Sequence, residues 1–173
     1  RGTLFPYTTL FRSHEVDIDP KWDAEKLVTE LFGEIVEPTL VNPTFVYDYP
    51  PSAQPLARPH RSGAPLIEAW DLIIGGMERG TAFSELIDPV IQRERLTAQS
   101  LLAAAGDDEA MELDEDFLRA LEHGAPPMGG LGLGIDRLIM LLAGNQDPER
   151  PGTVVRQPGI RETILFPLMK PEA

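Results

Sequence analysis

Cysteine is absent from the 173-residue chain, which excludes disulfide bonds, thiolate catalysis and cysteine-ligated metal sites. Histidine is scarce, and the three copies, His14, His60 and His123, show no metal-ligand spacing. No apolar run approaches the roughly 20 residues that a membrane-spanning helix requires. With 42% hydrophobic and 25% charged residues, the composition is that of an ordinary globular protein. These features predict one globular, cytoplasmic domain with no membrane partner.

Basic residues are also few, since 15 lysines and arginines face 28 aspartates and glutamates and leave a net charge of -13. Such acidity argues against a broad nucleic-acid-binding surface, because phosphates attract positive charge. Any contact with nucleic acid is therefore expected to be local, or to come from another domain. Residues 1–13 are set apart, because they resemble the translation of a sequencing-library adapter. We expect 1–13 to be a non-native segment and 14–173 to form the domain.

The most informative segment present is the run GGLGLGIDRLIMLL at 129–142, in which Gly130, Gly132 and Gly134 alternate with apolar residues. In a strand they would share one face, and the apolar residues between them the other. Glycine weakens a strand unless something approaches its backbone closely. A ligand lying flat on this bare face is therefore preferred to a strand packed beneath another element. A helix is expected to begin near Asp136, with Arg137 in its first turn, where a planar cation can stack on a base or bind phosphate.

Two common phosphate-binding motifs do not fit this run. The dinucleotide fingerprint G-x-G-x-x-G fails because Ile135 stands where its last glycine belongs. The phosphate loop G-x-x-x-x-G-K-[ST] fails because Gly134 is followed by Ile135 and Asp136. The glycines therefore indicate a different way of approaching a nucleotide.

Elsewhere the sequence predicts strands and helices that do not alternate as βαβ units would. Apolar spacing of helical period predicts helices over 23–36, 89–105 and 115–122. Strands are expected at 44–47, at the glycine run, at 164–166 and in a β-hairpin over 68–86 that turns at 75–76. Proline and glycine predict loops over 51–65 and 144–159. The predicted fold class is α+β, an antiparallel sheet flanked by helices.

Two acids of the hairpin are candidate metal ligands. If Ile74 pairs with Met77, then Asp71 lies opposite Gly80, and Asp71 and Glu78 become diagonal neighbours on one face, about 7–8 Å apart at the backbone. Mg²⁺ prefers oxygen ligands and is commonly held by one or two carboxylates plus substrate phosphates, as an ATP site provides. The alternative is that both residues are ordinary surface acids.

The glycine run resembles motif 3 of the class II aminoacyl-tRNA synthetases, an alternating glycine and apolar strand that ends in an acidic residue and arginine. Further stretches make residues 15–171 similar to lysyl-tRNA synthetase in particular. They are TAFSELIDP at 81–89, QRERL at 92–96, IRETILFP at 160–167, NPTFVYDYP at 42–50 and AGDDEAM at 105–111. The resemblance implies the class II synthetase fold, here without motif 1, motif 2 or an anticodon-binding barrel. We therefore expect the C-terminal portion of a catalytic domain, inactive by itself.

The resemblance also implies ATP-dependent activation of lysine and its transfer to tRNA(Lys), with Mg²⁺ as cofactor. Family members form homodimers, largely through the motif 1 that is missing here. ATP is assigned to Gly130, Gly132, Gly134, Arg137, Asp71 and Glu78, with Arg137 as the catalytic residue and Asp71 and Glu78 as the metal ligands. Lysine is assigned to Glu85, which receives its ammonium group, and to Thr81, where relatives often carry asparagine.

The lysine assignment requires a departure from regular strand pairing. In the regular hairpin, Thr81 and Glu85 lie on the face opposite Asp71 and Glu78. We therefore predict a β-bulge near Gly80, which would reverse the alternation of side chains.

Two other functions stay open. One is the synthetase-like domain of a lysyl-phosphatidylglycerol-forming protein, which shares the same motifs and would be revealed by a membrane-spanning domain upstream. The other is a non-catalytic synthetase paralogue that serves as an interaction module. Loss of Asp71, Glu78 or Arg137 would favour that second alternative, and all three are present.

Overall fold

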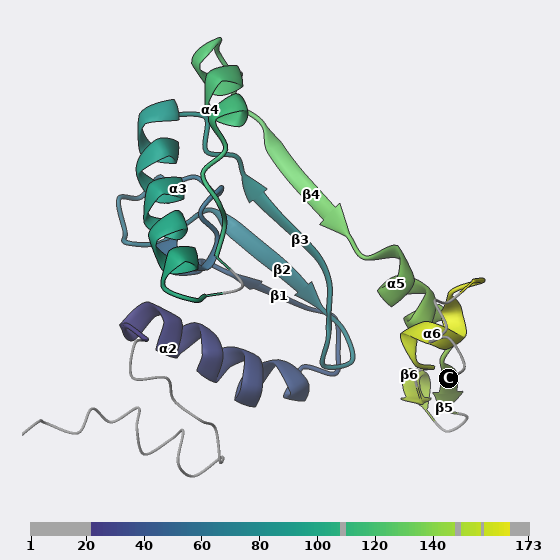
Figure 1. Cartoon of the computed structure of the whole chain (residues 1–173). Helices are drawn as coiled ribbons and strands as arrows, with labels where there is room; N and C mark the ends of the chain where they lie inside the picture. The colour runs from purple at the N-terminus through teal and green to yellow at the C-terminus, as the bar shows by residue number, and fades with distance from the viewer. Residues whose placement is uncertain (1–21, 108–109, 148–149, 157, 167–173) are drawn as a thin grey trace, which may run out of the picture.

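The computed structural model describes residues 22–107, 110–147, 150–156 and 158–166, so the predicted adapter-derived segment 1–13 lies outside the described residues. Its centre is a four-stranded antiparallel sheet in the order β1-β2-β3-β4 (Figure 1). The strands are β1 (Thr44–Tyr47), β2 (Ala69–Ile73), β3 (Glu78–Ser84) and β4 (Gly129–Leu133). Together with the surrounding helices, this sheet confirms the predicted α+β class.

Three helices border the sheet, and each begins where the sequence predicts. They are α2 (Ala24–Leu31), α3 (Pro89–Ala104) and α4 (Glu115–Glu122). An aspartate caps each one by accepting main-chain N–H groups of the first turn; the caps are Asp23, Asp88 and Asp114. The predicted helix 23–36 is only partly α-helical, because Phe32–Val36 forms a π-helical turn, followed by a 3-10 turn at Glu37–Thr39.

The loop 51–65 fastens the end of β3 to α3. It contains a 3-10 turn at Pro51–Ala53, and Ala57 forms an isolated antiparallel bridge with Glu85. The guanidinium of Arg95 in α3 donates to the main-chain oxygen of Ala57 at 2.6 Å. A buried cluster of Ala57, Ile67 and Ala69 packs against the same region. Glu85 is thereby held in place just beyond its strand.

Two predictions for the C-terminal part are wrong. The stretch 144–159, expected to be a loop, contains the antiparallel strands β5 (Asn145–Asp147) and β6 (Arg150–Arg156). The β-branched run 153–155 outweighs the nearby proline and glycine. Residues 164–166, expected to be a strand, follow α6 (Ile160–Thr163) and pair with no strand in the described ranges. A short apolar run becomes a strand only beside a partner, and Phe166 is 90% exposed.

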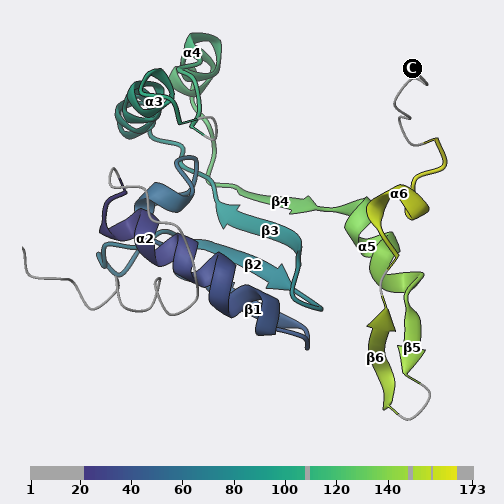
Figure 2. The same cartoon turned by 60° about the horizontal axis from the view of Figure 1, so that its bottom comes forward.

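The glycine strand connects the sheet to these C-terminal elements. β4 pairs with β3 and then leads away to α5 (Ile135–Leu142), with β5, β6 and α6 beyond it (Figure 2). The predicted helix start near Asp136 is confirmed, with Gly134 as the N-cap residue.

Candidate active site

The β2–β3 hairpin contains one β-bulge. Ile73 pairs with Glu78, whereas Leu72 pairs with Gly80, so Arg79 is the extra residue on β3. A bulge of this kind reverses the alternation of side chains beyond it. The bulge predicted near Gly80 is thus confirmed, one residue earlier in the chain.

The bulge decides which side chains share a face of the sheet. Asp71 pairs with Thr81 rather than with the Gly80 expected from regular pairing, and Thr81 pairs in turn with Gly132. Cross-strand partners share a face, and successive residues alternate. We call one side the carboxylate face; its members are Thr44, Val46, Ala69, Asp71, Ile73, Glu78, Thr81, Phe83, Gly130 and Gly132. The opposite side, the aromatic face, carries Phe45, Tyr47, Trp70, Leu72, Gly80, Ala82, Ser84, Gly129, Leu131 and Leu133.

The glycines of β4 make room for side chains of the carboxylate face. A Cβ added to Gly130 would collide with Oε1 of Glu85, so this carboxylate lies across the bare side of Gly130. A Cβ added to Gly132 would lie 3.5 Å from Cγ2 of Thr81. A ligand therefore cannot lie flat along the whole strand as predicted, because Glu85 already occupies the space at Gly130.

Three carboxylates gather near the β2–β3 turn. Oε1 of Glu37 accepts the main-chain N–H of Glu78 at 3.2 Å. Burial raises the pKa of Glu78, and the negative charge of Asp71 raises it further, while Arg137 opposes the shift. Burial also raises the pKa of Tyr49, whose hydroxyl is hydrogen-bonded to Asp71. This end of the face therefore concentrates negative charge.

The tight hairpin turn explains why Glu37 lies beside Glu78. Gly75 and Gly76 both have positive φ, 66° and 67°, which suits a two-residue turn. The N–H of Gly76 donates to the main-chain oxygen of Leu40 at 3.0 Å. A Cβ at Gly76 would lie only 2.8 Å from the main-chain oxygen of Pro38. Glycine thus lets the turn pack directly against the 3-10 segment that contains Glu37.

Arg137 closes the acidic end of the face from the first turn of α5. Its Nη1 donates to the main-chain oxygen of Glu78 at 3.1 Å and lies 3.9 Å from Oε2 of the same residue. A Cβ added to Gly134 would meet Cδ of Arg137 at 3.4 Å, so this third glycine also borders a site side chain. The Arg137 side chain remains 46% exposed, which leaves N–H donors directed to solvent and open to a ligand.

The predicted lysine-binding residues occupy the other part of the carboxylate face. Burial raises the pKa of Glu85. The buried Oγ1 of Thr81 has no hydrogen-bond partner among the described residues. An acid and an unsatisfied hydroxyl on the same face are chemically suited to a ligand that donates hydrogen bonds, such as an ammonium group.

The carboxylate pair fits a metal that arrives with a nucleotide. In the part of the chain that the structure describes, no group of three or more histidine, cysteine or acidic side chains is placed to hold a metal ion. Burial is the main cause of the raised pKa of Glu78, and repulsion from the carboxylate of Asp71 adds to it. A divalent cation relieves this repulsion, and Mg²⁺ commonly takes two carboxylates and completes its shell with phosphate oxygens and water.

Three residues of this site were not predicted from the sequence. Glu37 lies 41 positions from Glu78, and no motif connects the two. Tyr49 belongs to the stretch 42–50, which resembles the synthetase family and was the one available signal. Arg79 is buried by the bulge and could not be recognised from a regular strand pattern.

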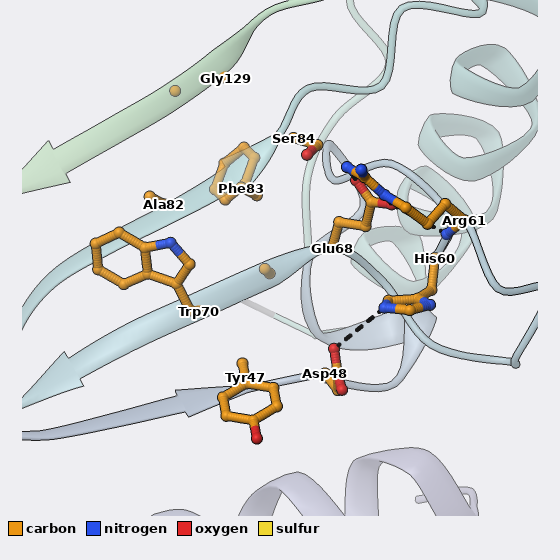
Figure 3. A pocket seen from close by; sticks show the side chains of 12 residues that line it. Tyr47, Asp48, His60, Arg61, Glu68, Trp70, Ala82, Phe83, Ser84 and Gly129 are labelled. Atoms are coloured by element: carbon orange, nitrogen blue, oxygen red, sulfur yellow. Dashed lines mark hydrogen bonds and ion pairs between the residues drawn. The ribbon is translucent and has the colours of Figure 1, made fainter.

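The aromatic face contains a hollow of about 420 Å³. Figure 3 shows Tyr47 and Trp70 along it, with Arg61 and Glu68 at one end. Arg61 and Glu68 are paired with each other, with Nε of Arg61 lying 2.6 Å from Oε1 of Glu68. Of the predicted site residues, only Gly130 lines this hollow. The predicted chemistry therefore lies on the opposite side of the sheet from the hollow.

Comparison with known proteins identifies the family. The model of the family described as tRNA synthetases class II (D, K and N) matches residues 14–170, and the chain belongs to this family. Similar proteins include the lysylphosphatidylglycerol biosynthesis bifunctional protein LysX of Nocardia farcinica, 53% identical over 150 residues, which are 87% of this chain and 12% of that protein. The protein of the same name from Mycobacterium tuberculosis H37Rv is 54% identical over 151 residues, again 87% of this chain and 12% of the relative.

These comparisons confirm the class II synthetase fold but do not identify which amino acid such a domain would activate. The matching family covers aspartate, lysine and asparagine enzymes, so the narrower likeness to lysyl-tRNA synthetase is not established by it. The chain spans 12% of the length of the curated relatives it matches, and their name agrees better with the lipid-linked alternative. Within the described ranges, no helix is long and apolar enough to cross a membrane.

Proposed function

We propose that the carboxylate face is the ATP- and lysine-binding wall of a domain that activates lysine within a bifunctional lysylphosphatidylglycerol-forming protein. The observation that carries this proposal is the bulge at Arg79, which brings Thr81 and Glu85 to the side of Asp71 and Glu78. The relatives support the lipid-linked setting, because proteins 53% and 54% identical to the chain are named for lysylphosphatidylglycerol biosynthesis.

Glu85 supplies the selectivity for lysine. Its carboxylate lies across Gly130 in a partly buried position that raises its pKa. A bound ammonium group restores the charged form and completes the hydrogen bonding of the carboxylate, whereas a neutral amino acid leaves it unpaired. The Thr81 hydroxyl offers a further polar contact on the same face.

Arg137 and the carboxylate pair act on the nucleotide. An oxygen of the lysine carboxylate attacks the α-phosphorus of ATP, pyrophosphate leaves, and a tRNA ribose hydroxyl then attacks the carbonyl and releases AMP. The exposed guanidinium of Arg137 neutralises charge that develops on the α-phosphate. Asp71 and Glu78 would hold Mg²⁺, which supplies charge neutralisation to the phosphates when bound. Positioning and electrostatics are sufficient, so no covalent enzyme intermediate is needed.

A free lysyl-tRNA synthetase is the second candidate. The stretches 81–89 and 160–167 favour it, because they resemble that enzyme. Both candidates share lysine activation and differ in what surrounds this domain. The full reading frame that contains His14 distinguishes them: encoded membrane-spanning segments support the bifunctional protein, and a soluble anticodon-binding domain alone supports the free synthetase.

A chimera tests lysine activation directly. Residues 14–170 replace the matching segment of the Nocardia farcinica relative, and ATP–pyrophosphate exchange is measured with lysine, aspartate and asparagine in turn. Exchange that depends on lysine supports the proposal. Exchange with aspartate or asparagine would refute the choice of amino acid. An inactive chimera that remains folded, beside an active unmodified relative, would refute the catalytic role.

A further inference from the structure

Arg79 is the largest fully buried side chain in the described part of the chain, with 1% of its surface exposed. Burying a guanidinium is costly unless its N–H groups find acceptors. Nε of Arg79 donates to the main-chain oxygen of Ile74 at 3.1 Å, and Nη1 donates to the main-chain oxygen of Arg137 at 2.7 Å. These acceptors are backbone carbonyls of two different elements, so the side chain connects the hairpin to α5.

Reciprocal bonds strengthen this connection. The N–H of Gly134 donates to the main-chain oxygen of Arg79 at 2.9 Å. In the opposite direction, the Arg137 side chain donates to the main-chain oxygen of Glu78. Arg79 therefore holds the backbone of Arg137, while Arg137 holds the backbone next to Arg79, across 58 positions of sequence.

The charges of Arg79 and Arg137 agree with one of them being buried and the other exposed. Burial lowers the pKa of Arg79, and the nearby charge of Arg137 lowers it further. Repulsion between the guanidinium groups favours an arrangement in which one is anchored inside and the other points outward. The observed exposures match that arrangement, since Arg79 is 1% exposed and the Arg137 side chain 46%.

We propose that Arg79 is a positioning residue that fixes the main chain at Arg137, so that the Arg137 guanidinium meets the nucleotide in one orientation beside Glu78. Arg79 itself touches no substrate in this scheme and acts through Arg137. The link between hairpin and helix follows from the contacts alone, and its effect on the nucleotide rests on the proposed function.

Hydrogen–deuterium exchange on the 173-residue chain tests the link without relying on activity. Arg79→Met is expected to accelerate amide exchange over 134–142 by about tenfold or more, because α5 loses its anchor, while exchange in α3 and α4 is unchanged. Arg79→Lys should give an intermediate effect, since an ammonium group reaches one carbonyl but lacks the planar fork. Arg61→Met is the matched control, because Arg61 pairs with Glu68 on the aromatic face. Unchanged exchange over 134–142, or equal acceleration in every helix, would overturn the proposal.

Kinetics of the chimera test the effect on the nucleotide. Arg79→Met should raise KM for ATP about tenfold and leave KM for lysine within about twofold, since one charge-assisted anchor is lost away from Glu85. In an Arg137→Ala background the same change should add nothing to KM for ATP, because the residue through which Arg79 acts is gone. Additive effects, or equal shifts in both KM values, would refute positioning through Arg137. If the parent chimera shows no exchange activity at all, the proposed function fails, and the deuterium experiment still decides whether Arg79 anchors α5.

Discussion

On the carboxylate face of the sheet, side chains from β2, β3 and α5 lie close together beside the bare glycines of β4. The aromatic face of the same sheet presents apolar side chains to solvent. The acids Asp71, Glu78 and Glu85 belong to the first, and the bulge was needed to bring Glu85 there. On the second, Tyr47 and Leu131 are 69% and 66% exposed. The contrast teaches that the composition of each face of this sheet depends on one break in the regular alternation of side chains, at Arg79.

Removing the Arg137 guanidinium should have the largest effect on activity, and it tests whether the carboxylate face is the functional one. In the chimera, Arg137→Ala is expected to reduce lysine-dependent ATP–pyrophosphate exchange about 100-fold or more, because a preorganised charge at the α-phosphate is lost. Arg119→Ala is the control, since Arg119 lies on α4 and pairs with Asp116 at the surface. Equal activities in the two variants would remove Arg137 from the mechanism.

The glycine strand offers a matched pair of substitutions, one on each face. Gly130→Ala would push its Cβ into Glu85 and is expected to raise KM for lysine about ten- to hundredfold through the lost charge-assisted contact. Gly129→Ala should leave KM for lysine within about twofold, because its Cβ would meet the Phe83 oxygen at an ordinary 3.5 Å. Similar effects of both changes would mean that the strand, and not Glu85, determines lysine binding.

Local periodicity was sufficient to predict β1 to β4, the starts of α2 to α5 and the position of the hairpin turn, but it missed β5, β6 and α6. The bulge was predicted only because the family resemblance placed Glu85 in the site, which regular pairing does not allow. The burial of Arg79 and the approach of Glu37 could not be foreseen, because Arg79 is anchored in part by a main-chain group 58 positions away and Glu37 by one 41 positions away. The wrongly predicted strand at 164–166 failed for a related reason, since pairing depends on a neighbouring strand that local sequence does not specify.

Glu78 on the carboxylate face and Glu68 beside the aromatic face have pKa values that are shifted in opposite directions. Burial and the charge of Asp71 raise the pKa of Glu78, so the native state holds this proton more tightly than the unfolded state does. Stability due to Glu78 therefore falls as pH rises from the ordinary carboxyl range through its raised value. Hydrogen bonds from Arg61 and Ser84 lower the pKa of Glu68, so its contribution is present above the ordinary range and is lost as pH falls through its lowered value.

Urea unfolding of the 173-residue chain checks this difference. At pH 7, Glu78→Gln should raise the unfolding midpoint relative to the parent chain, and the gain should disappear below the ordinary carboxyl range. Glu68→Gln should lower the midpoint at pH 7 and lose that effect in strong acid. A lower midpoint for both variants at pH 7 would show that Glu78 is stabilised by its partners and is not held at an electrostatic cost for binding.

The smallest effect is expected on the aromatic face, where exposure limits what a side chain contributes. Leu131→Thr should change the free energy of unfolding of the 173-residue chain by no more than about 0.5 kcal/mol, because Leu131 is 66% exposed and threonine suits a strand. Leu118→Ala is the comparison, since Leu118 is fully buried in α4 and its truncation should cost about 2–5 kcal/mol. If Leu131→Thr also costs several kcal/mol in urea titrations, then Leu131 is packed in solution. The two faces would in that case differ in their chemistry and not in their exposure, because only the charged side chains would still distinguish them.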